Sequence, residues 1–149
     1  RGIEAALAQA GVETRFTAET EAELWKKFVY LTALSGMTCY TRGPIGPIRD
    51  DPQRLVMLRE AMAEAIAVGR AKGVRLAPDA LDERMGVAMR LAPEMKASML
   101  YDLERGNRLE LPWLSGAVVR MGREMGVPTP THARIVDALT PYAQGGKVT

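Results

Sequence analysis

The spacing of hydrophobic residues along the chain is that of helices rather than strands. Apolar residues recur three or four positions apart through most of the sequence, as at Leu55, Leu58, Met62 and Ile66, and this interval places them on one helix face. We expect roughly seven helices, over residues 2–10, 21–40, 52–73, 78–91, 93–105, 112–125 and 131–143. The pattern therefore predicts an all-α domain.

One stretch departs from the helical pattern. Residues 12–17 alternate between apolar and polar side chains, which is typical of a short strand. A lone strand has no sheet to join, so we interpret residues 1–18 as a helix–strand remnant of a larger upstream fold. Residues 19–149 then form the helical domain.

Glycine and proline predict where the helices end. A Gly-Val pair follows three predicted helices, at Gly11, Gly73 and Gly126, as expected for a glycine C-cap whose next residue folds back onto the last turn. Thr20 with Glu23 has the spacing of a capping box, and residues 42–47, rich in Gly and Pro, predict a break.

The longest predicted helix, 21–40, changes character along its length. Its charged residues come early, and its second half is nearly all apolar, so we expect that half to be the centre of the core. The uncharged run from Phe28 to Thr41 is shorter than the ~20 residues that span a bilayer. It is therefore read as a buried helix, and no membrane partner is expected.

Composition narrows the function classes further. The chain has 149 residues, 20 basic and 18 acidic, for a net charge of +2, without a basic tract, so nucleic acid is not an expected partner. A single cysteine, Cys39, favours a reducing, cytoplasmic setting. No signal peptide is visible. The chain begins with Arg1 rather than Met, which suggests a fragment.

Residues 95–116 concentrate the polar groups that could carry chemistry. Ser98 and Asp102 share a predicted helix, which Gly106-Asn107 ends, and Glu110 follows between two leucines in a short extended piece. A carboxylate flanked by leucines needs a partner or a helix N-terminus nearby. The residues alone favour a helix–turn–helix corner over a catalytic site, and both interpretations stay open at this point.

The same stretch resembles the C-terminal domain of the ketopantoate reductase family. The matching residues, in order, are Trp25-Lys26-Lys27, Ser98-Met99 with Asp102, Glu110, Gly116, and Gly126-Val127 with Pro130. The resemblance covers roughly residues 19–144. It implies a helical domain of the 6-phosphogluconate dehydrogenase C-terminal-like type, and it makes residues 1–18 the end of a Rossmann nucleotide-binding domain.

The resemblance also implies roles for particular residues. Lys27 matches the lysine that donates a proton to the ketone oxygen, although Lys26 offers the same charge and the sequence alone does not choose between them. Ser98 matches a serine that binds the substrate carboxylate. Glu110 matches a glutamate that contacts the cofactor ribose, and we expect it on one cleft wall with Lys27, separated by no more than one or two waters. Asp102 is interpreted as structural.

The sequence departs from the resembled family at three positions that bind the substrate there. Leu31, Ser35 and Ile45 stand where better-known members have asparagines, and leucine or isoleucine cannot donate and accept hydrogen bonds as asparagine does. Ser35 is retained as a candidate substrate contact. We expect a more apolar 2-keto acid than ketopantoate.

Two functions from different classes follow. The first is the C-terminal part of an NADPH-dependent 2-keto acid reductase; no G-x-G-x-x-G turn is present, so we expect NADP to bind mainly on a missing N-terminal Rossmann domain and not to this chain by itself. The alternative is a non-catalytic helical dimerisation or interaction domain. A homodimer is expected in either case.

The remaining candidates have structural interpretations. His132 is expected at the surface, and Cys39 is expected in the core. The nine methionines are expected to fill the core. No metal-ligand cluster is visible.

Overall fold

The protein is a bundle of α-helices in the computed structural model, which describes residues 2–12 and 19–146. These residues form the helices α1 (Gly2–Gln9), α2 (Thr20–Thr41), α3 (Ile45–Asp50), α4 (Pro52–Ala71), α5 (Ala80–Met89), α6 (Ser98–Arg105), α7 (Ser115–Met125) and α8 (Pro130–Leu139), with a 3₁₀ turn, η1 (Thr140–Tyr142). The all-α prediction is confirmed, and the described residues contain no strand. Apart from Val12, the strand expected at 12–17 lies outside the described residues.

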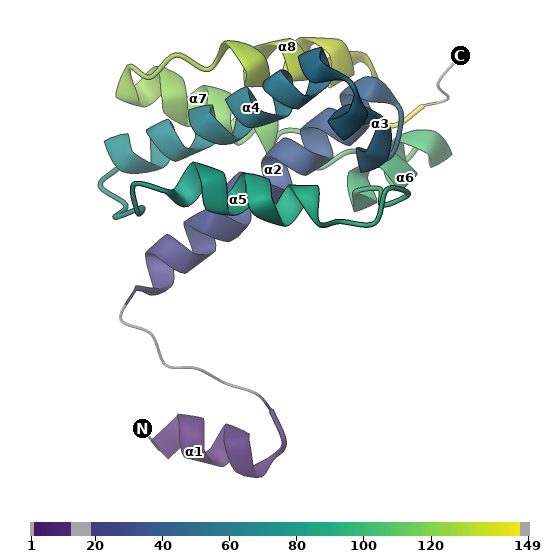
Figure 1. Ribbon diagram of the computed structural model, residues 1–149. Helices are drawn as coiled ribbons and strands as arrows, with labels where there is room; N and C mark the ends of the chain where they lie inside the picture. Colours follow the sequence, from purple (N-terminus) through teal and green to yellow (C-terminus); the bar gives the residue numbers. More distant parts are fainter. Residues whose placement is uncertain (1, 13–18, 147–149) are drawn as a thin grey trace.

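Helix α2 is the central element of the bundle. Figure 1 shows it running through the middle of the other helices, with its N-terminal half extending out of the bundle toward α1. Every residue from Thr32 to Cys39 is buried, and α2 contacts α3 through α8. The prediction that its second half forms the centre of the core is confirmed.

The Gly-Val pairs end their helices as predicted. Gly73 and Gly126 have φ values of +89° and +68°, a conformation that glycine adopts without strain. The following Val74 and Val127 donate their backbone N–H to Gly69 O and Gly122 O at 3.0 and 2.8 Å. This is the six-to-one bond of the Schellman motif.

The predicted break at residues 42–47 contains the start of an additional helix, α3. Its first backbone donors, Ile45 N and Gly46 N, bind Met95 O and Pro93 O at 3.0 and 2.8 Å. The prediction that Pro93 opens the next helix is wrong. The carbonyls of Pro93 and Met95 accept these bonds from α3, and α6 begins only at Ser98.

Helix α7 also begins later than predicted. We expected it from Pro112, but residues 111–114 form turns and α7 starts at Ser115. Leu114 has φ −103° and ψ −104°, which is outside the helical region and separates the turns from the helix. The predicted extended piece at 108–111 is irregular, with a bend at Glu110.

The prediction that His132 lies at the surface is wrong. Its side chain is fully buried, with Nε2 2.9 Å from Ala61 O and Nδ1 3.1 Å from Ser115 Oγ. Because a carbonyl only accepts, Nε2 carries a proton. Burial lowers the pKa of His132 and so favours the neutral ring, in which Nδ1 accepts from the Ser115 hydroxyl. The imidazole thus joins α4, α7 and α8.

A glutamate from another helix caps the start of α8. The Glu64 carboxylate accepts the backbone N–H groups of Thr131 and His132 at 2.7 and 3.0 Å. These are two of the donors that a helix N-terminus leaves unpaired, and a negative charge there is favourable. The cap fixes α8 against α4 and holds His132 in its buried place.

Two buried threonines on α2 provide a matched test of polar burial. Thr38 Oγ1 donates to Leu34 O at 2.8 Å, whereas the buried Thr32 hydroxyl has no hydrogen-bond partner among the described residues. We predict that Thr32→Val stabilises the protein by about 1 kcal/mol, because it removes an unsatisfied polar group without changing shape. Thr38→Val should cost about 0.5–1 kcal/mol. Urea unfolding of both variants measures the difference, and equal effects would contradict it.

Burial of His132 predicts loss of stability in mild acid. Desolvation lowers the pKa of His132 below its ordinary 6.5, against smaller opposing effects of the Ala61 hydrogen bond and Glu64. The unfolded chain therefore binds more protons in the window between the lowered folded pKa and 6.5, so stability falls as pH falls through it. We expect the urea midpoint to drop between about pH 7 and pH 5.5. His132 is the single histidine of the sequence, so His132→Gln should be less stable at neutral pH and lose this slope; an unchanged slope would contradict the assignment.

Candidate active site

Lys27 lies on the open face of α2. Its neighbours along that face, Leu24 and Leu31, are 63% and 39% exposed, and Lys27 is exposed between them. One helical turn after Leu31 the same face reaches Ser35, which is 5% exposed. Apolar side chains standing in water beside an ammonium are typical of a surface that another molecule or domain covers.

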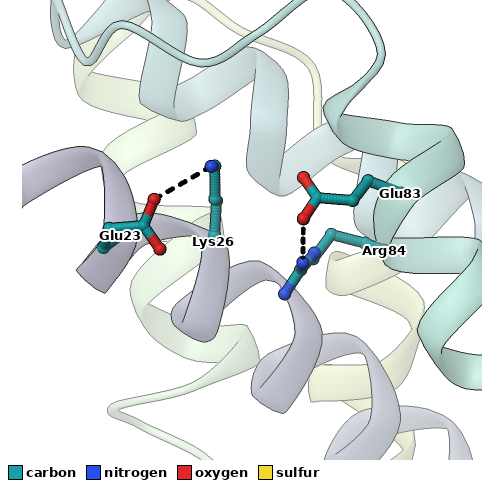
Figure 2. A network of polar contacts seen from close by, with 4 residues as sticks. All are labelled: Glu23, Lys26, Glu83 and Arg84. Carbon is teal, nitrogen blue, oxygen red and sulfur yellow. Dashed lines mark hydrogen bonds and ion pairs between the residues drawn. The ribbon is translucent and has the colours of Figure 1, made fainter. Parts of the chain in front are cut away.

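The two neighbouring lysines have different surroundings. Lys26 Nζ donates to Glu23 at 3.0 Å, and this hydrogen bond raises the Lys26 pKa. Figure 2 shows this pair on α2 and the pair formed by Glu83 and Arg84 of α5, with Arg84 extending toward α2. Lys27 makes no hydrogen bond or ion pair with any residue that the structure describes. Of the two ammonium groups, that of Lys27 is the one without a partner among the described residues.

Ser98 begins α6 and is accessible. It lines an open hollow of about 340 Å³ together with Tyr101, Asp102 and Arg105, residues that one helix face brings together. Asp102 accepts a hydrogen bond from Asn107 Nδ2 at 3.1 Å, and its carbonyl accepts the Asn107 N–H at 2.8 Å. Asp102 thus ties down the turn after α6, which confirms its structural interpretation.

Glu110 occupies the corner before α7 and points its carboxylate to solvent. Its flanking leucines, Leu109 and Leu111, are 1% and 2% exposed, whereas Glu110 is exposed. Its backbone carbonyl accepts from Trp113 N and Leu114 N at 3.0 and 3.1 Å, which fixes the corner. An exposed carboxylate of this kind can accept a hydrogen bond from a ribose hydroxyl.

The structure brings α2 and the start of α7 into contact. A Cβ on Gly36 of α2 would lie 3.0 Å from Ser115 Oγ, and Ser115 is five residues after Glu110. No hydrogen bond or ion pair between described residues joins Lys27 to Glu110. Their expected separation of one or two waters stays a prediction.

The three positions that replace family asparagines differ in exposure. Leu31 is 39% exposed, Ser35 is 5% exposed, and Ile45 is completely buried in the core. Only Leu31 can present much surface to a ligand in this chain. That surface is apolar.

Other chemistry finds little support among the described residues. Burial raises the pKa of the Cys39 thiol to about 12, so the thiolate needed for nucleophilic attack is not formed at neutral pH. Residues 2–12 and 19–146 contain no cluster of three or more His, Cys, Asp or Glu side chains suited to a metal. None of their helices is both long enough and apolar enough to span a bilayer.

A dinucleotide pyrophosphate does not fit the described part of the chain. Such a group binds at a glycine-rich turn between a strand and a helix N-terminus. Here the glycines with positive φ that follow helices, Gly11, Gly73, Gly106 and Gly126, lie at helix C-terminal ends. Those ends present carbonyl groups, which do not bind anions.

Two long-range polar contacts were missed by reasoning from sequence. Glu64 caps α8 across 67 residues of sequence, and Trp25 donates to Ala65 O across 40 residues. No local spacing indicates either pair. For the Trp25 contact, the sequence offered one signal: Gly69 interrupts an otherwise regular helical pattern.

Comparison with known proteins identifies a matching family and a matching fold. Residues 19–143 match the family model described as "Ketopantoate reductase PanE/ApbA C terminal". The 2-dehydropantoate 2-reductase of Mesorhizobium japonicum is 33% identical over 125 residues, which are 84% of this chain and 38% of that protein. The chain thus spans less than half the length of this relative.

Solved structures show the same helical arrangement. A PanE/ApbA family ketopantoate reductase from Ralstonia eutropha has a TM-score of 0.86 at 28% identity, over 95% of this chain and 47% of its own. A ketopantoate reductase from Staphylococcus aureus, described as dimeric, also has a TM-score of 0.86, over 96% of this chain and 50% of its own. At 21% identity, the second shows a shared fold.

Proposed function

The chain belongs to the ketopantoate reductase family, as its C-terminal domain, and from this premise we propose that it is the substrate side of an NADPH-dependent 2-keto acid reductase. Residues 19–149 are then the helical catalytic domain, and residues 1–18 are the end of a preceding nucleotide-binding domain. One observation carries the proposal. Lys27, the lysine in the family register, is exposed and unpaired among the described residues, whereas its neighbour Lys26 is bound to Glu23.

Lys27 acts as the proton donor. When bound, a reduced nicotinamide supplies the hydride that converts the carbonyl carbon to an alcohol carbon. Lys27 Nζ donates a proton to the carbonyl oxygen as that oxygen gains negative charge, and the product is a 2-hydroxy acid. The lysine, left neutral, regains its proton from solvent. An ammonium without a partner among the residues that the structure describes is available for this role.

Ser98 and Glu110 hold the reactants in this proposal. The Ser98 hydroxyl donates to the substrate carboxylate from the accessible first turn of α6. The exposed Glu110 carboxylate accepts a hydrogen bond from a hydroxyl of the cofactor ribose. Ser35 is nearly buried, so its hydroxyl makes at most a small contact with the substrate.

The preceding domain covers the open face of α2. Exposed Leu24 and Leu31 would be removed from water by that contact, which is favourable at about 25 cal/mol per Å² of apolar surface. NADP would then be held mainly by that domain, because the described part of this chain has no turn for its pyrophosphate. A homodimer, as described for the Staphylococcus aureus relative, is part of the same proposal.

Replacing each lysine of the pair separates their roles. We predict that Lys27→Met, in the product of the complete gene, lowers kcat for NADPH-dependent reduction of 2-keto acids by about 10²- to 10⁴-fold. Lys26→Met, its matched control one residue away, should change kcat by less than about 3-fold because it removes only a partly exposed i,i+3 ion pair. The reverse pattern would reassign the donor. A wild-type protein inactive with every keto acid would instead support a non-catalytic dimerisation or interaction domain.

The apolar Leu31 predicts substrate preference. We expect 2-keto acids with unsubstituted hydrocarbon side chains to have a higher kcat/KM than ketopantoate, whose hydroxyl finds no partner on leucine. Leu31→Asn should shift the ratio toward ketopantoate by about 10-fold, on the scale of one hydrogen bond. Steady-state kinetics over a panel of 2-keto acids measures both ratios. Ketopantoate as the best substrate of the wild-type protein would contradict the idea.

A further inference from the structure

The N-terminal half of α2 is anchored to α4 by one large side chain, Trp25. Its indole Nε1 donates to Ala65 O at 3.0 Å, and Phe28 packs against the ring edge-on, with centroids 5.4 Å apart and planes inclined at 63°. Figure 1 shows that this half of α2 extends out of the bundle. Trp25 is therefore a main determinant of its direction.

Gly69 provides the seat for the indole on α4. A Cβ at position 69 would lie 2.6 Å from Trp25 Cε2, 2.7 Å from Cδ1 and closer still to Nε1, so any larger residue would displace the ring. Gly69 follows Ala65 by four residues and therefore lies on the same helix face. A glycine inside a helix costs about 1 kcal/mol relative to alanine, and the close approach of the ring explains why one stands here.

The anchor also fixes the direction of the catalytic lysine. Successive residues of a helix are about 100° apart, so Lys27 lies about 200° around α2 from Trp25. The face that Trp25 turns toward α4 thus sets the opposite face, where Lys27 stands exposed between Leu24 and Leu31. The intervening Lys26 binds Glu23 of the same helix (Figure 2).

We infer that Trp25, seated on Gly69, is a positioning residue that aims Lys27 at the substrate carbonyl. The inference rests on the proposed function, in which Lys27 donates a proton to the carbonyl oxygen. Trp25 itself touches no substrate. A proton donor must stand within about 2.6–3.2 Å of its acceptor, and a displacement of about 1 Å can lower a rate by about 100-fold. The close fit of indole and glycine provides that precision.

Gly69→Ala tests the seat directly. The added methyl group forces the indole back by about 1 Å to reach ordinary contact distance, and this moves the first turns of α2. We expect kcat in the product of the complete gene to fall on the order of 10- to 100-fold, with the KM for NADPH nearly unchanged. Gly86→Ala, on α5, is the matched control, because a Cβ there meets only the tip of Arg90 at 3.3 Å. Its kcat should stay within about 2-fold of the wild type.

A smaller ring should reverse the effect. Trp25→Phe removes the hydrogen bond to Ala65 O and part of the contact, and we expect a milder loss of kcat, on the order of 3- to 10-fold. In Gly69→Ala combined with Trp25→Phe, the methyl group fills the space of the lost indole atoms. This double variant should recover activity relative to Gly69→Ala. A merely structural clash would lower stability without this reversal in kcat, and additive losses would overturn the inference.

A spectroscopic readout on this chain keeps the test independent of activity. Reductive ¹³C-methylation labels the lysines, and we expect Gly69→Ala to shift the NMR signal of Lys27 while that of Lys96, in the loop before α6, stays in place. An unmoved Lys27 signal in a folded variant would overturn the inference even if the enzyme is active. An inactive wild type with a moved Lys27 signal would overturn the proposed function and leave the packing relation established.

Discussion

The burial of the C-terminal half of α2 is the constraint on which the rest of the fold depends. An unbroken buried run from Thr32 to Cys39 requires neighbours on every side, and α3 to α8 supply them. No comparable enclosure exists around Leu24, Lys27 and Leu31. One helix therefore belongs to the core in its second half and carries exposed side chains in its first. Lys27, on the exposed half, makes no hydrogen bond or ion pair with any residue that the structure describes.

The packed interior also holds polar groups that water does not reach, and long-range contacts satisfy those at the start of α8. His132 bonds to α4 and α7 through its two ring nitrogens, and Glu64 supplies two acceptors at the start of α8. Each contact joins separate helices, so satisfying a polar group also fixes the position of an element. Thr32 is an exception among the described residues, since its buried hydroxyl has no partner. An unsatisfied group of this kind has an unfavourable free energy that the packing around it must offset.

Local patterns predicted the helices well and the long-range contacts not at all. The limits of α2 and the glycine ends at Gly73 and Gly126 followed from periodicity and backbone preference, which are properties of neighbouring residues. The burial of His132 did not, because Ser115 and Ala61 lie 17 and 71 residues away in sequence. The late start of α6 had a similar cause, since the carbonyls of Pro93 and Met95 bind α3. For the site, the residues alone left Lys26 and Lys27 equivalent; the family resemblance chose Lys27, and the bond between Lys26 and Glu23 supports that choice.

The joint between α3 and the loop before Ser98 has a consequence for how this domain can diverge in sequence. Its two bonds run between backbone atoms, from Ile45 N to Met95 O and from Gly46 N to Pro93 O, so side chains on the loop do not make them. A Cβ on Gly46 would lie 3.0 Å from both Cβ and O of Pro93, so the glycine is the position that cannot change freely. Mutations in the loop can therefore accumulate while α6 keeps its place. Among relatives, a varied loop beside an invariant glycine would be the evolutionary trace of this joint.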